Sequence, residues 1–67
     1  MKEITVNLDI ILKNRGITSK ELASRIGITE ANLSILKTGK AKGIRFGTLA
    51  NICEELNCQP GDILKYE

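Results

Sequence analysis

The sequence predicts an all-α domain of five short helices, two of which are joined by a tight turn, with a short strand near each end of the chain. Three observations support this fold class: apolar residues recur at helical spacing, threonines precede two of the helices, and glycines follow helices. A chain of 67 residues has room for one domain, residues 1–67, and its small core requires well-capped helices.

The start of the chain, residues 3–6, alternates apolar and polar residues and therefore favours a strand. Such a short strand needs a partner, and Leu64–Tyr66 could pair with it in antiparallel fashion. We therefore expect the two ends of the chain to be tied together.

The first helix is predicted directly after this strand. One apolar stripe at helical spacing begins at Leu8 and reaches Arg15. Asn7 is the expected N-cap, and Gly16 is expected to end the helix in the left-handed conformation.

The next two helices begin with the same device. Thr18 and Thr29 stand at N-cap positions, and Glu21 follows Thr18 at the spacing of a capping box. Gly27 lies between the two helices and can take a positive φ, so the chain should turn sharply there. Two helices packed across such a turn form a helix-turn-helix. Apolar pairs at the spacing of a hydrophobic staple flank both caps: Ile17 with Leu22, and Ile28 with Leu33.

The second half of the chain predicts two further helices. A basic loop over residues 41–45 precedes a helix over Phe46–Leu56, which Asn57 or Cys58 should end. Pro60 suits the first position of a last helix over residues 60–64. The expected core consists of apolar residues that share helix faces: Leu22, Ala23, Ile26, Leu33, Leu36, Leu49, Ile52 and Leu56.

Charge is distributed unevenly along the chain. The net charge is only +2, too small to indicate a nucleic-acid partner by itself. Residues 31–53 nevertheless carry +4 with no acidic residue, whereas residues 54–67 carry −3. We expect the basic side chains of the middle to contact a polyanion rather than only solvent: Lys37, Lys40, Lys42 and Arg45.

Several functional classes are excluded by composition. With no His and only Cys53 and Cys58, the chain has too few soft ligands for a zinc site, and neither a metal, a cofactor nor a disulfide is expected. No nucleophile stands beside a base, and the adjacent Glu54 and Glu55 fit a solvated helix face, so we expect no enzyme activity. The chain shows neither a signal peptide nor an apolar run of about 20 residues, which predicts a cytoplasmic protein.

Two stretches of the sequence resemble a known family. TSKELASRIGITEANLSILKTGK and IRFGTLANICEELNCQPGDILKY are similar to Cro/C1-type (phage-repressor-like, XRE family) helix-turn-helix transcriptional regulators, especially the small single-domain members. The resemblance covers nearly the whole chain from about Leu8 onward. The residues at family spacing are Glu21, Leu22, Ala23, Gly27, Leu33, Leu36 and Gly39.

The resemblance implies a five-helix DNA-binding domain whose recognition helix, Glu30–Lys37, enters the major groove of double-stranded DNA. It places Ser19 and Lys20 at a phosphate or at the edge of the site. The positions that it turns toward base edges are Thr29, Glu30, Ala31 and Ile35. Those that it places near the DNA backbone are Asn32, Thr38, Lys40, Lys42 and Arg45, with Arg45 able to probe the minor groove. Asn32 or Ser34 could also bond a base if the helix rotates slightly.

The recognition helix departs from the family pattern. Family members commonly carry Gln, Arg or Asn where this chain has Glu30, Ala31 and Ile35. Glu30 could accept a hydrogen bond from cytosine, and the two apolar residues could touch thymine methyl groups. We therefore expect a readout that depends on apolar contacts, phosphate positioning and DNA shape.

The same departure leaves a second hypothesis open. The chain could be a helix-turn-helix module that binds a protein, as an antitoxin or an anti-regulator does, with weak or no DNA specificity. Ile35 is then a partner contact rather than a base contact.

Under the first hypothesis the protein represses transcription as a homodimer, because one recognition helix reads too few base pairs. The dimer surface is expected toward the late helices and the C-terminus, where Ile44, Ile63 and Tyr66 have apolar atoms that would not all fit inside. No small-molecule ligand is expected.

Overall fold

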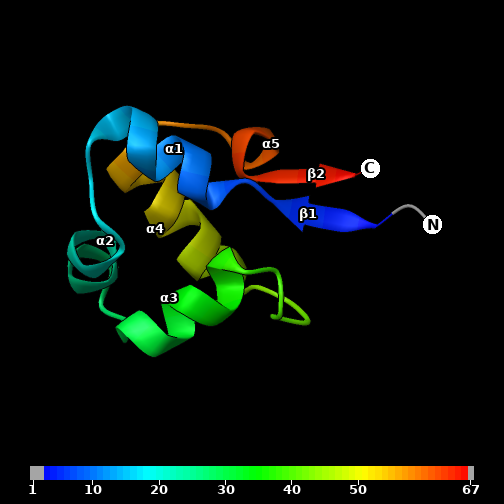
Figure 1. Ribbon diagram of the computed structural model, residues 1–67, viewed down its shortest axis with the longest axis horizontal. Helices are drawn as coiled ribbons and strands as arrows, with labels where there is room; N and C mark the ends of the chain where they lie inside the picture. The colour runs from blue at the N-terminus through cyan, green and yellow to red at the C-terminus, as the bar shows by residue number, and fades with distance from the viewer. Residues whose placement is uncertain (1–2, 67) are drawn as a thin grey trace.

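The computed structural model describes residues 3–66 and shows five helices with one pair of antiparallel strands, as predicted (Figure 1). The elements in chain order are β1 (Ile4–Val6), α1 (Leu8–Arg15), α2 (Ser19–Ile26), α3 (Glu30–Lys37), α4 (Phe46–Leu56), α5 (Pro60–Ile63) and β2 (Leu64–Tyr66). Leu64 begins β2 and does not belong to the last helix, which is therefore one residue shorter than predicted.

The core lies around α4, which contacts α1, α2 and α5. The eleven buried hydrophobic residues come from all five helices: Leu8, Ile11, Leu12, Leu22, Ala23, Leu33, Leu36, Leu49, Ile52, Leu56 and Ile63. Ile26 was expected to be buried but is only partly so, at the edge of this cluster. No helix in residues 3–66 is long and apolar enough to pass through a lipid bilayer.

Ile63 corrects one prediction about the dimer surface. Its side chain has no exposed area, whereas we expected it to contribute apolar atoms to an interface. The reason is tertiary: α5 folds back onto α1 and α4, and the Asn7 amide donates to the Ile63 carbonyl at 2.7 Å.

The helix ends follow the predicted caps and turns at four points. The hydroxyl oxygens of Thr18 and Thr29 each accept a hydrogen bond from the backbone amide three residues later, at 3.1 Å. Gly16 and Gly27 have φ values of 67° and 77°, which a Cβ would make unfavourable.

Two details of the capping differ from the prediction. Asn7 is the N-cap residue of α1, as expected, but its side chain makes no capping hydrogen bond, and its backbone at φ −103° and ψ 29° lacks the extended conformation of a capping residue. The Glu21 carboxylate points toward Arg25 at 3.6 Å instead of completing a capping box. A capping box occurs at α5, where the Asp62 carboxylate accepts from the Gln59 amide at 2.9 Å.

The end of α4 is closed by local and distant contacts. Asn57 takes a left-handed conformation, and the Cys58 amide donates to the Cys53 carbonyl at 3.0 Å, as in a Schellman motif. Arg15 on α1 donates from its Nε to the Leu56 carbonyl at 2.8 Å. Both cysteines are free thiols. Burial raises the pKa of Cys58, and the neighbouring Cys53 raises that pKa further, so this thiol is a poor nucleophile.

The two strands extend beyond the helices at one end of the molecule (Figure 1). Ile4 pairs with Tyr66 and Val6 with Leu64, so these four residues share one face of the sheet. Val6 and Leu64 pack against the core. Thr5 and Lys65 lie on the opposite face.

Candidate nucleic-acid interface

The outer face of α3 is largely apolar at its centre. Leu33 and Leu36 point into the core with 0% and 8% exposure. Since successive residues of a helix are about 100° apart, Ala31 and Ile35 lie opposite to this buried side. Ile35 is 47% exposed. The centre of the predicted reading face therefore offers methyl groups and no hydrogen-bonding group.

Polar side chains flank this apolar centre. Asn32 lies on the flank that faces the start of α4, and Ser34 lies on the other flank; both are exposed. Glu30 stands in the first turn, where its charge favours the positive end of the helix. The Thr29 hydroxyl oxygen accepts from the Asn32 amide, so its own proton is available to an outside acceptor.

Lys37 turns away from this face and joins three helices. Its ammonium nitrogen lies 2.9 Å from the Ser19 hydroxyl on α2 and 3.3 Å from the Asp9 carboxylate on α1. Its side chain is only 23% exposed. The basic surface predicted for the middle of the chain thus loses one of its four members, and Ser19, a predicted phosphate contact, is held against α3. The next residue, Lys20, is exposed.

Thr38 uses its hydroxyl proton within its own helix. The hydroxyl donates to the Ser34 carbonyl at 2.9 Å, and the Ile35 carbonyl lies at 3.3 Å. A phosphate oxygen only accepts hydrogen bonds, so a contact from Thr38 to the DNA backbone would require this bond to break.

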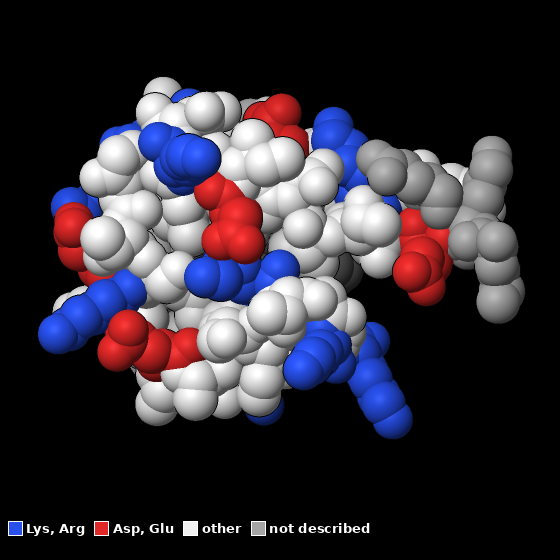
Figure 2. Space-filling model, viewed as in Figure 1, with Lys and Arg blue, Asp and Glu red and all other residues white. Residues whose placement is uncertain are grey.

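The loop between α3 and α4 carries the remaining basic residues of the segment, Lys40, Lys42 and Arg45, all exposed. Its start is fixed, because the amides of Lys40 and Ala41 both donate to the Ile35 carbonyl, at 3.1 and 3.2 Å. Figure 2 shows blue side chains projecting where this loop lies in Figure 1, with no red atoms beside them. The loop is therefore an anchored, positively charged edge next to α3.

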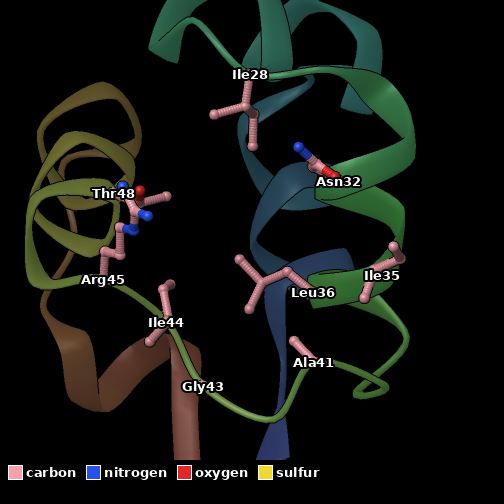
Figure 3. A pocket seen from close by; sticks show the side chains of 9 residues that line it. All are labelled: Ile28, Asn32, Ile35, Leu36, Ala41, Gly43, Ile44, Arg45 and Thr48. Carbon is pink, nitrogen blue, oxygen red and sulfur yellow. The ribbon is translucent and has the colours of Figure 1, made fainter.

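A groove of about 500 Å³ separates α3 from the start of α4 (Figure 3). Asn32 and Leu36 face it from α3, and Arg45 and Thr48 face it from the other side. Its floor is apolar, with Ile44 projecting from the loop. Two polar groups of different chemistry, an amide and a guanidinium, thus stand on opposite sides of one hollow.

Arg25 belongs to a different part of the surface. It lies 3.6 Å from Glu21 and 3.8 Å from Glu55, and so links α2 to α4. The predicted solvated carboxylate at Glu55 is in fact paired. Residues 3–66 contain no group of three or more potential metal ligands.

Sequence reasoning missed Lys37 as a bridge and the groove beside Asn32. No local signal could have indicated either, because Lys37 meets Ser19 and Asp9 from distant parts of the chain and the groove walls come from separate helices. Thr48 carried no sequence signal, since it lies within the apolar pattern of α4.

Comparison with known proteins agrees with this geometry. The sequence model of the family described as the Cro/C1-type HTH DNA-binding domain matches residues 7–67. The chain is 59% identical over 63 residues to the uncharacterized HTH-type transcriptional regulator YozG of Bacillus subtilis (strain 168), covering 94% of this chain and 75% of that protein. The crystal structure of the transcriptional regulator VanUg superimposes with a TM-score of 0.79 at 30% identity, covering 98% of this chain and 87% of that one.

Proposed function

Because this chain belongs to the Cro/C1-type helix-turn-helix family of DNA-binding transcriptional regulators, we propose that it is a sequence-specific repressor that binds double-stranded DNA as a homodimer. In this proposal α3 lies in the major groove and the loop over residues 41–45 follows the DNA backbone.

The observation that carries the proposal is the groove between Asn32 and Arg45. One sugar-phosphate strand separates the major groove of a duplex from its minor groove. A protein that reads both grooves at once therefore needs a hollow between its two reading groups. The groove of about 500 Å³ provides this hollow, with Asn32 on the α3 side and Arg45 on the loop side. The side-chain amide of Asn32 can form two hydrogen bonds with one adenine, and the positive charge of Arg45 suits the negative potential of a narrow minor groove.

The charges next to the groove support the same docking. Lys40 and Lys42 are exposed on the loop and can replace counterions at phosphates. The capped N-terminus of α3 adds backbone N–H groups that favour an anion. Affinity then comes mainly from the loop and the helix start. Specificity comes from Asn32, Ser34 and the apolar centre of α3 in the major groove and from Arg45 in the minor groove.

Selection from a library of random duplexes tests this function, followed by a salt titration on the enriched duplex and on a scrambled one. We expect a palindromic site to be enriched and log K to fall against log salt with a slope of about −4 to −9, as about five to ten neutralised phosphates give. Repression is then tested by transcription in vitro from a promoter that contains the site. Equal, weak binding of both duplexes would contradict the proposal.

A second candidate function rests on Ile35. A side chain of this size that is 47% exposed at the centre of a helix face also suits a protein partner, such as a toxin or a sigma factor. Under this alternative, reversing the charges of Lys40 and Arg45 leaves partner binding largely intact, whereas under the first proposal it abolishes DNA binding.

A further inference from the structure

The end of the molecule opposite α2 carries an apolar surface that is formed by the two strands and bounded by the loop after α3. On the shared face of the sheet, Val6 and Leu64 cover the core, but Ile4 and Tyr66 extend past it and are 60% and 69% exposed. Figure 1 shows both strands projecting beyond the helices at this end. The apolar face of the sheet is thus longer than the core that it covers.

A hollow lies directly under this projecting face. It has a volume of about 240 Å³, and its walls are Ile4, Val6 and Leu64 on one side and Ala41, Lys42 and Ile44 on the other. The sheet and the loop after α3 therefore form the two sides of a shallow apolar notch. Leu36, from the core side of α3, closes its inner end.

A projection beside a hollow of similar chemistry is self-complementary. In a two-fold interface the same surface serves both partners, so the projection of each copy must enter the hollow of the other.

We propose that two copies of this chain associate through this end of the molecule, with Ile4 and Tyr66 of each copy seated against the notch lined by Ala41 and Ile44 of the other. The inference rests on the proposed dimeric binding of DNA and names the surface that joins the two copies.

The dimensions of the molecule agree with this choice of surface. Its longest extent is 34 Å, so two copies that overlap at this end have centres at most one molecular length apart. Successive major grooves on one side of a duplex repeat every 34–36 Å or so. Because α3 runs along the side of the molecule rather than at the joined end, both copies can present it to the same face of DNA (Figure 1).

The area of the contact predicts its strength. The end face measures at most 21 × 19 Å, which is smaller than the roughly 800 Å² per partner of a standard interface. The association is therefore weak in free solution and becomes strong when both copies bind one duplex, which appears as cooperativity between half-sites.

The test compares two exposed isoleucines. Ile4→Asp alters the proposed interface, and Ile10→Asp on α1 is the matched control, since the two side chains are 60% and 61% exposed and the charge change is the same. Ile4→Thr retains a β-branched side chain and guards against loss of the strand. Each variant is compared with the wild type by sedimentation equilibrium up to about 1 mM. Each is also titrated on a duplex with two half-sites and on one with a single half-site.

We expect the wild type and Ile10→Asp to self-associate and to bind two half-sites with about 5- to 150-fold cooperativity. Ile4→Asp should sediment as a monomer and lose this cooperativity while its single-site affinity changes by less than about 2-fold, and Ile4→Thr should lose part of it. Equal cooperativity of Ile4→Asp and Ile10→Asp overturns the inference, and so does a wild type that is monomeric in solution and non-cooperative on DNA. If no duplex is bound, the proposed function fails, and sedimentation of the same variants still decides the inference.

Discussion

The outer face of α3 and the loop that follows it are neighbours with opposite chemistry. The face presents Ala31 and Ile35 at its centre. The only basic residue of α3, Lys37, is turned inward to Asp9 and Ser19. The loop presents exposed Lys40, Lys42 and Arg45 and is held to α3 by two bonds to the Ile35 carbonyl. Under the proposed function, this difference assigns most of the attachment to DNA to the loop and most of the reading of its sequence to α3, so each should be alterable with little effect on the other.

The largest effect should come from reversing the loop charges. Lys40→Glu with Arg45→Glu should weaken binding of every duplex by on the order of 100-fold or more at about 0.15 M salt, and should flatten the salt dependence, because phosphate contacts and counterion release are lost. Lys13→Glu, an exposed reversal on α1, is the control for net charge. Fluorescence anisotropy measures both, and an equal loss per reversed charge would contradict a special role for the loop.

Removing the side-chain amide of Asn32 beside the groove should have the next largest effect on DNA binding. Unlike the loop reversal, it should change the sequence preference. Asn32→Ala should lower affinity for the selected duplex by about 10-fold or more and relax preference at one base pair, since a bidentate contact contributes about 1–3 kcal/mol of discrimination. The salt slope should stay unchanged because no phosphate contact is lost. Repeating the selection with this variant reads the preference directly. A uniform loss at all duplexes would place Asn32 on the backbone instead.

Lys37, the basic residue that faces inward, should matter more for the stability of the fold than for DNA binding. Lys37→Met removes a part-buried ammonium that bonds Ser19 and faces Asp9, and should lower the free energy of unfolding by about 1–2 kcal/mol. The expected fall in melting temperature is about 4–8 °C per kcal/mol for a chain of this size. Lys40→Met should change stability by less than about 0.5 kcal/mol. Thermal unfolding followed by circular dichroism compares the two variants. Equal melting temperatures would contradict a stabilising role for the contacts of Lys37 with Ser19 and Asp9.

The α3 cap should give a smaller effect. Thr29→Ala leaves the backbone N–H of Asn32 without its acceptor and should destabilise the protein by about 1 kcal/mol. Thr29→Ser keeps the hydroxyl and should retain most of the stability. Chemical denaturation measures both, and the cap explanation fails if serine and alanine behave alike.

The smallest effect on DNA is expected at Thr38. Thr38→Val removes a hydroxyl whose proton already goes to the Ser34 carbonyl, so DNA affinity should change by less than about 2-fold. Anisotropy at two salt concentrations measures this. A larger loss would show that the hydroxyl turns toward phosphate on binding.

The sequence predicted the local features of the interface well. The caps at Thr18 and Thr29, the turn at Gly27 and the bounds of α3 and α4 are confirmed, because each depends on residues within one turn of the helix. The site residues themselves remain predictions about DNA contact. Their exposure agrees with such a role for Asn32, Lys40 and Arg45, whereas the bond made by Thr38 opposes it.

The errors have a common physical origin. Asn7 was expected to cap α1 with its side chain, but the structure shows no such bond; the backbone N–H of Asn7 instead donates to the Ile63 carbonyl of α5. Glu21 was assigned a capping box, but Arg25 one turn later competes for its carboxylate. Ile63 was expected at the surface because a four-residue helix has no periodicity that shows which side is buried.

The sequence by itself therefore determined the helices, their caps, the tight turn and the excess of positive charge in the middle of the chain, since propensity and capping act over three or four residues. The tertiary structure alone decided which basic side chains face solvent, where the groove opens and which apolar residues extend past the core. Lys37 shows the reason: its charge belongs to the basic segment in the sequence, but the packing of α1 and α2 against α3 supplies the partners that hold it inside.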